Sequence, residues 1–225
     1  MVARGDTQHI SEGNLPQVAT SRIPDKALKT PLKGDAMTRV TLTKFASLCR
    51  SKISNKEKFK SLIRWMHQEF LHYHTVTHLA LYQLSPHSKK PILKKVHSPK
   101  IEKVYREIEN AHRDLLLLRY WCKASIEGYG NNTLVLFVTA DTSLLDLARL
   151  VLHSTLCEQE MQNSFRQRLI ELWGETTGGE LSNFYLSMKQ ITGSPDRASN
   201  QPNFPSHYEH LEAVRSDLEL CRGFT

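Results

Sequence analysis

The chain has 225 residues, of which 40% are hydrophobic and 24% are charged, as is usual for a globular protein. No stretch approaches the roughly eighteen consecutive apolar residues that span a bilayer, and the first residues hold no apolar signal-peptide core. We therefore expect a nuclear or cytoplasmic protein that is neither secreted nor inserted in a membrane.

The four cysteines lie far apart, and no C-x-x-C pair occurs. This spacing excludes a zinc ribbon, a ferredoxin-type iron–sulfur cluster and a thioredoxin-like redox pair. In a reducing compartment, cysteines of this kind behave as small buried apolar side chains. We expect that role for Cys49, Cys122, Cys157 and Cys221.

The net charge of +7 is unevenly distributed along the chain. Residues 26–106 carry 18 Lys and Arg against 4 Asp and Glu, whereas residues 107–225 carry 10 against 16. Such a division favours an anionic partner for the basic half. A solvated basic face without a partner is the alternative explanation.

Residues 1–34 show no hydrophobic periodicity and are punctuated by glycine and proline, which predicts a disordered tail. Thr30 lies in this tail and precedes a proline, as Ser98 and Ser194 do further along the chain. These three residues are therefore candidate sites for phosphorylation by a proline-directed kinase. A phosphate on Ser98 would add negative charge at a helix N-terminus and should stabilise that helix.

Two helices are predicted between the tail and residue 84. Asp35 can cap the first, over about 36–51, with an inward side made of Val40, Phe45, Leu48 and Cys49. Ser54 and Glu57 form a capping box for the second, because each side chain can satisfy a backbone N–H at the helix start. Its apolar residues recur at helical spacing and predict one continuous helix to about Leu84.

Histidines are concentrated in this second helix. If it is continuous, His74 and His78 point the same way and His67 lies two turns earlier on that flank. These three residues are the candidate metal ligands, since imidazoles at such spacing can chelate Zn²⁺. A structural zinc site needs four ligands, however, and no H-E-x-x-H motif is present. We therefore predict half-exposed histidines and no metal site.

Residues 98–128 form the most clearly framed helix of the chain. Ser98 is suited to the N-cap, Pro99 to the first turn and Gly128 to the stop. Apolar and small residues at spacings of three and four place one face against the core, namely Ile101, Val104, Ile108, Ala111, Leu115, Leu118, Cys122 and Ser125. We expect this helix to be a spine that contacts helix 55–84 on one side and helix 143–173 on the other.

The remaining chain adds three further helices. Residues 134–138 are apolar and predict either a short buried strand or the first turns of a core helix. Asp141 or Thr142 can cap a long helix over 143–173, with a kink near Ser154. The sequence predicts a loop at 176–179 and a shorter helix at about 181–191.

A Pro/Ser/Asn-rich linker at 193–206 precedes a terminal amphipathic helix at 207–222. Ser206 and Glu209 repeat the capping-box pattern there, with Tyr208, Leu211, Leu218 and Cys221 on one side. The expected fold is therefore mainly α, an irregular bundle of about five to six helices. A helical domain at 35–192 lies between the tail and the linker.

No motif points to catalysis or to a cofactor. A P-loop, a G-x-S-x-G nucleophile elbow and clustered carboxylates are all missing from the sequence, so we predict a non-enzymatic protein without a cofactor. The preferred hypothesis is a helical protein-interaction subunit, an adaptor or regulator, that contacts partner proteins through apolar helix faces. Its basic half would contact an acidic partner.

The alternative hypothesis is a helical protein that binds RNA or DNA without sequence specificity through residues 26–106. Lysine predominates there, which suits contact with phosphates better than base readout. The candidate phosphate-contacting residues are Lys52, Lys56, Lys58, Lys60, Arg64, Lys89, Lys90, Lys94 and Lys95.

Overall fold

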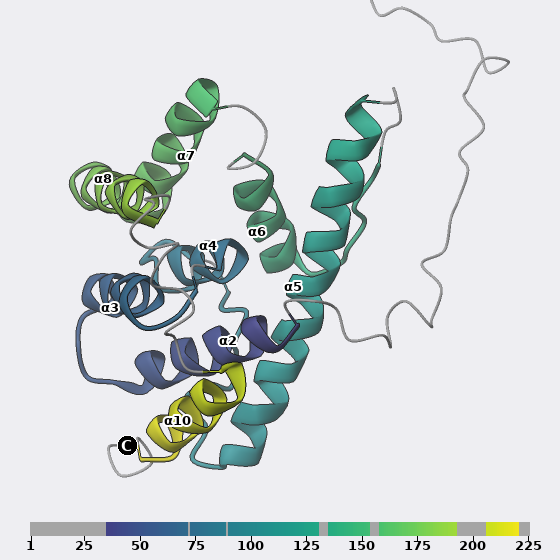
Figure 1. Cartoon of the computed structure of the whole chain (residues 1–225). Helices are drawn as coiled ribbons and strands as arrows, with labels where there is room; N and C mark the ends of the chain where they lie inside the picture. The colour runs from purple at the N-terminus through teal and green to yellow at the C-terminus, as the bar shows by residue number, and fades with distance from the viewer. Residues whose placement is uncertain are drawn as a thin grey trace, which may run out of the picture. The chain divides into compact units, whose positions relative to one another are not determined.

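The computed structural model describes residues 35–71, 73–88, 90–130, 135–153, 158–192 and 206–220. These ranges contain eight helices and no strand, which confirms the all-α prediction (Figure 1). The predicted tail at 1–34 and all of the predicted linker except Ser206 lie outside them. The helices are α2 (Asp35–Arg50), α3 (Asn55–Gln68), α4 (His74–Gln83), α5 (Ile101–Gly130), α6 (Thr142–His153), α7 (Glu158–Trp173), α8 (Glu175–Thr192) and α10 (His207–Leu220).

The prediction of one continuous helix over 55–84 is wrong, because the chain turns between α3 and α4. At this turn the Phe70 ring stacks on Trp65 with centroids 5.1 Å apart, and the backbone N–H of Tyr73 donates to Met66 Sδ at 3.4 Å. The two halves need different surroundings. Helix α3 keeps one flank in solvent, whereas residues 75–82 of α4 are all buried. The turn lets the second half enter the core while the first stays at the surface.

The predicted helix over 143–173 is also two helices, α6 and α7. Its predicted cap is confirmed, since the Asp141 carboxylate accepts hydrogen bonds from the backbone N–H groups of Ser143 (2.9 Å) and Leu144 (3.2 Å). Helix α7 is tied to α4 by the Trp173 indole N–H, which donates to Leu81 O at 2.9 Å.

The predicted loop at 176–179 is wrong, because these residues are helical within α8. The turn occurs earlier, at Gly174, whose φ of +79° is in the left-handed region that favours glycine. Gly178 serves packing instead. A Cβ at that position would lie 2.5 Å from the backbone oxygen of Leu169 in α7, so its absence lets α7 and α8 approach closely.

Helix α5 is the spine that the sequence predicts. Its predicted inward residues from Ile101 to Cys122 are all buried, and the helix packs against α2, α4 and α6. The predicted N-cap at Ser98 and first turn at Pro99 are wrong, because the helix starts at Ile101. It follows a bend in which Ser98 Oγ accepts from Lys100 N at 3.2 Å. It continues past the predicted stop at Gly128 to Gly130.

The terminal helix α10 packs against α2 (Figure 1). Its capping box is confirmed in both directions, since Ser206 N donates to Glu209 Oε2 at 2.7 Å and Glu209 N donates to Ser206 Oγ at 3.3 Å. The predicted inward position of Tyr208 is wrong, because this side chain is 73% exposed. The buried face of α10 is formed by His210, Val214 and Leu218.

Residues 135–139 form neither of the two predicted elements, neither a buried strand nor the first turns of a helix. They run without regular secondary structure beside α5, where the Trp121 indole N–H donates to Val135 O at 3.1 Å. Leu136 and Val138 are 69% and 90% exposed. An apolar run alone does not reveal that two of its apolar side chains are exposed.

Candidate functional site

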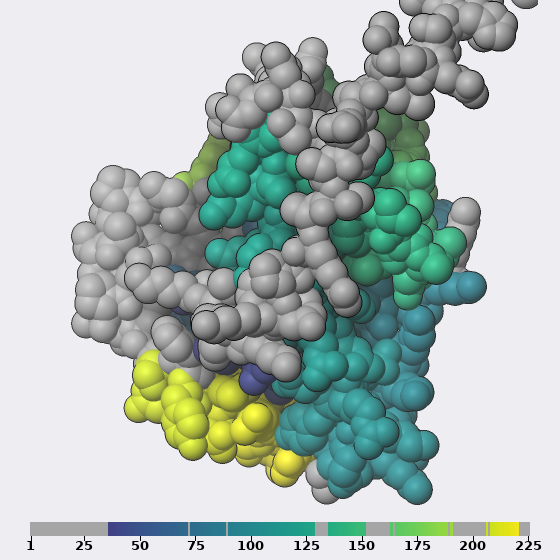
Figure 2. Space-filling model, turned by 90° about the vertical axis from the view of Figure 1, so that its right-hand side faces the viewer, coloured from purple at the N-terminus to yellow at the C-terminus, as the bar shows by residue number. Residues whose placement is uncertain are grey.

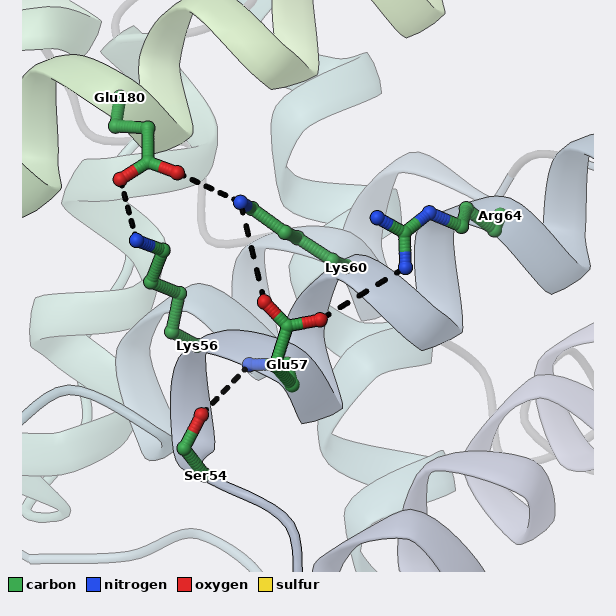
Figure 3. Close-up of polar contacts among 6 residues, drawn as sticks. All are labelled: Ser54, Lys56, Glu57, Lys60, Arg64 and Glu180. Atoms are coloured by element: carbon green, nitrogen blue, oxygen red, sulfur yellow. Dashed lines mark hydrogen bonds and ion pairs between the residues drawn. The ribbon is translucent and has the colours of Figure 1, made fainter.

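Three of the predicted phosphate-contacting residues, Lys56, Lys60 and Arg64, lie on one flank of α3, and Figure 3 shows that the two lysines point at Glu180 of α8. Glu180 of α8 accepts from Lys56 Nζ at 2.5 Å and from Lys60 Nζ at 2.6 Å. These two hydrogen bonds hold the pKa of the Glu180 carboxyl below its usual value. Part of the positive charge of α3 is therefore matched inside the fold.

A second carboxylate lies within the same flank. Ser54 Oγ accepts from the backbone N–H of Glu57, which confirms one half of the predicted capping box. The Glu57 carboxylate faces Lys60 Nζ at 3.9 Å and Arg64 at 3.8 Å. We call Lys56, Lys60 and Arg64 the α3 flank. The cations of the α3 flank link this helix to Glu180 of α8 and to Glu57 in the first turn of α3 itself.

An aromatic ring completes the α3 flank on its α8 side. Lys60 Nζ lies 5.7 Å and Arg64 Cζ 5.8 Å from the centroid of the Phe184 ring. Cations at this distance from a ring face are attracted to it. The ring also covers part of the flank, which reduces the surface available to a phosphate.

Two further cations of the basic half are buried. Lys58 Nζ donates to the backbone oxygen of Cys49 at 3.0 Å, and Arg50 donates to the backbone oxygens of Val96 and Ser98, both at 2.9 Å. Positive side chains at the C-terminal end of α2 interact favourably with its helix dipole. Lys58 is one of the predicted phosphate contacts, yet its ammonium group serves this internal role.

The remaining predicted cations that the structure describes are exposed: Lys52 follows α2, and Lys90, Lys94 and Lys95 precede α5. Lys89 lies outside the described residues. The structure adds three exposed residues that the sequence analysis did not select, Lys100, Lys103 and Arg106, at the start of α5. Their spacing of three was a usable signal, because it places them on one side of a helix.

We define the cation strip as the six exposed side chains Lys90, Lys94, Lys95, Lys100, Lys103 and Arg106. This part of the chain forms open surface, coloured blue to teal, at the lower right of Figure 2. Within it, Lys94 Nζ lies 3.4 Å from Asp141. Beside it, the pKa of His97 lies below its usual value because of burial and the charges of Lys58 and Arg50.

A pocket of about 380 Å³ borders the cation strip and contains carboxylates. Lys94 and Lys95 line it together with Glu107, Asp114 and Asp141. The pKa of Asp114 lies above its usual value, first because it is half-buried and then because Asp141 is close. The strip therefore adjoins a mixed surface of both signs.

The basic and acidic halves of the sequence are joined by ion pairs. Besides the contacts of Glu180 and Asp141, Arg39 of α2 pairs with Glu109 of α5 at 3.2 Å. Lys44 of α2 pairs with Asp217 of α10 at 2.9 Å. The acidic half of the chain therefore supplies carboxylates that neutralise part of the charge of the basic half.

The histidines pack rather than converge on a metal-ligand set. The rings of His74 and His78 lie 4.2 Å apart, and His78 is fully buried against Phe165 (5.4 Å) and Tyr185 (6.1 Å). The prediction that His78 is half-exposed is therefore wrong. His67 belongs to a different helix, α3, because the predicted continuous helix is broken. No group of three His, Cys, Asp or Glu within the described ranges is placed to hold a metal ion.

Two other predictions concern single residues. Cys49 and Cys122 are buried as expected, and burial raises their thiol pKa to about 12 and about 11. Ser98 is half-buried, beside the buried Arg50 that binds its carbonyl oxygen. The other two candidate phosphorylation sites, Thr30 and Ser194, and the cysteines Cys157 and Cys221 lie outside the described residues.

Comparison with known proteins supplies no further guidance. No family model, curated protein or solved structure matches the chain. Among the described helices, none combines the length and the apolar character that crossing a membrane requires.

Proposed function

We propose that this chain is a helical protein-interaction subunit that binds an acidic partner protein through the cation strip. One observation carries the proposal. Within the described part of the chain, five of the six strip cations form no ion pair with a carboxylate, namely Lys90, Lys95, Lys100, Lys103 and Arg106. The cations of α2 and α3, in contrast, contact carboxylates or backbone carbonyls.

The row at the start of α5 is set by burial of the opposite face. Ile101 and Val104 are buried, which fixes the rotation of the helix and directs Lys103 and Arg106 outward. Side chains three apart are neighbours on a helix surface, so these two cations are adjacent, and the exposed Lys100 directly precedes the helix. An acidic segment of another protein could pair with the row residue by residue.

Carboxylates next to the strip favour a protein over a nucleic acid. Glu102 lies between two strip lysines in the sequence, and the adjoining pocket contains Glu107, Asp114 and Asp141. A continuous phosphate backbone would be repelled by these groups, whereas a folded partner can place its own charges around them. Nucleic acid remains the alternative and is an outcome of the experiment below.

The proposal is tested by fluorescence anisotropy with three labelled probes: a poly-glutamate peptide, single-stranded RNA and duplex DNA. We expect the peptide to bind at low salt, and Lys100→Glu with Lys103→Glu to weaken its binding roughly tenfold or more. Added salt should weaken it further. Negative charge in the first turn of a helix interacts favourably with its dipole, so the variant should fold.

The matched control is Lys123→Glu with Arg149→Glu. These cations are also exposed, but they pair within their own helices with Glu127 (3.7 Å) and Asp146 (3.6 Å). The control makes the same change in net charge and should leave peptide affinity within about twofold. Binding of RNA or DNA without binding of the peptide would establish the alternative. No binding of any probe at low salt would disprove both.

A further inference from the structure

Residues 135–139 carry a second surface feature, independent of the cation strip. Exposure alternates along them: Leu136 and Val138 face solvent, whereas Val135, Phe137 and Thr139 are half-buried. Alternation with a period of two is the pattern of an extended segment with one covered face. The covered face lies on α5, where the Phe137 and Trp121 ring centroids are 5.3 Å apart (Figure 1).

One backbone edge of this segment is not paired with any residue that the structure describes. Within the described residues, the backbone groups of 135–139 form no hydrogen bond with another backbone group. The oxygen of Val135 points to the Trp121 indole. Because successive residues of an extended chain direct their N–H and C=O groups to opposite edges, the groups of Leu136 and Val138 lie on the other edge. An unpaired extended edge is a template for pairing with another strand.

Charges or prolines usually protect such an edge in a monomeric protein. Here residues 128–140 contain no Asp, Glu, Lys, Arg or Pro. The segment therefore offers no charge for a charged partner to complement, and it carries no charge of its own that would repel an identical segment. These properties favour pairing of like with like.

We infer that residues 135–139 pair with the same residues of a second copy of this chain, as a two-stranded antiparallel ribbon centred on Phe137. A two-fold axis at Phe137 places Leu136 opposite Val138 of the second copy, and the reverse. Each exposed apolar residue then meets an exposed apolar residue. Leu136 and Val138 exchange backbone hydrogen bonds across the axis, and the two Phe137 residues form the central pair.

The register predicts an unusual pattern of charge substitutions. Leu136→Lys with Val138→Lys places lysine opposite lysine at both positions and should weaken dimerisation roughly tenfold or more. Leu136→Lys with Val138→Glu places lysine opposite glutamate at both positions, so this variant should dimerise at least tenfold more tightly than the double lysine variant. Both wild-type side chains are mostly exposed, so neither variant should disturb folding.

Sedimentation equilibrium of the full chain over a concentration series measures the association. Tyr208→Lys with Leu220→Lys is the matched control, because these side chains are 73% and 74% exposed on α10. It should leave dimerisation unchanged, as should Lys100→Glu with Lys103→Glu, which tests the cation strip separately.

Four results would overturn the inference. They are a chain that stays monomeric at every concentration, a dimer that survives the double lysine change, a dimer equally weakened by the α10 control, and a Lys/Glu variant no tighter than the double lysine variant. The last result would contradict the antiparallel register, in which position 136 faces 138.

Discussion

The α3 flank and the cation strip come from the same lysine-rich part of the sequence, but the fold treats them differently. Figure 3 shows that Lys56 and Lys60 meet Glu180 and that Arg64 meets Glu57. Arg64 also lies over the Phe184 ring, 5.8 Å from its centroid. Within the described residues, the strip cations, Lys100 and Lys103 among them, are exposed, and all but Lys94 form no ion pair with a carboxylate. Charge counted along a sequence therefore overstates the surface available to a partner, because the fold consumes part of it.

The largest expected effect comes from moving α8 away from α7. This movement would displace Glu180, the α8 residue that accepts hydrogen bonds from Lys56 and Lys60 of the α3 flank. Gly178→Ala puts a methyl group 2.5 Å from Leu169 O, and only movement of a helix can relieve that contact. We expect a loss of about 3 kcal/mol in the free energy of unfolding, measured by urea denaturation.

Gly179→Ala is the matched control for that change. Its added methyl group would meet only the end of the Arg166 side chain, at 3.7 Å. Alanine is a better helix former than glycine, so we expect a gain of about 0.5–1 kcal/mol. Equal destabilisation by both substitutions would contradict the packing role assigned to Gly178.

A second prediction contrasts a buried cation with an exposed one. Arg50→Met removes two hydrogen bonds and leaves the buried oxygen of Val96 without its donor, which should cost about 2 kcal/mol. Lys100→Met removes a strip cation that has no carboxylate partner and should change stability by less than about 0.5 kcal/mol. Urea denaturation of both variants checks the contrast. A larger loss for Lys100→Met would reverse the roles that we assign.

A smaller effect is expected from Glu180→Gln. This change removes the negative charge that Lys56 and Lys60 share, so the α3 flank becomes more like the cation strip. The pKa of Glu180 lies below its ordinary value in the folded chain because Lys56 and Lys60 donate to it, so its ionised form is stabilised by folding. That contribution is present at neutral pH and is lost as pH falls through the folded pKa. Thermal midpoints of wild type and variant should differ at pH 7 and converge in acid.

The same substitution should raise the affinity of the chain for the poly-glutamate peptide, because Lys56 and Lys60 lose their shared carboxylate. Anisotropy titration at low salt measures this gain. Unchanged affinity, together with thermal midpoints that differ equally at every pH, would show that Glu180 does not neutralise the flank.

Local sequence patterns predicted most of the helical framework. The spacing of apolar residues in α5 matched the buried face from Ile101 to Cys122, and the caps at Asp141 and Ser206 matched the structure. These features depend on side chains a few residues apart, so sequence alone specifies them.

Features that depend on distant residues were not predictable in this way. Gly178 resembles a loop residue in sequence. The structure shows instead that a side chain at this position would collide with the backbone of Leu169 in another helix. The predicted alignment of the histidines in α3 and α4 required one continuous helix. The chain turns between these two helices, where Phe70 stacks on Trp65. Likewise, no local signal shows that Glu180 lies opposite Lys60, 120 positions away in the chain.

Lysine acetylation followed by mass spectrometry tests the contrast between the two basic regions most directly. Without a partner, Lys95, Lys100 and Lys103 should react quickly, whereas Lys58 and Lys60 should react slowly because they are buried or paired. Adding poly-glutamate should protect the strip lysines and leave the other two unchanged. Protection of Lys60 with fully reactive strip lysines, or no protection at all, would contradict the account.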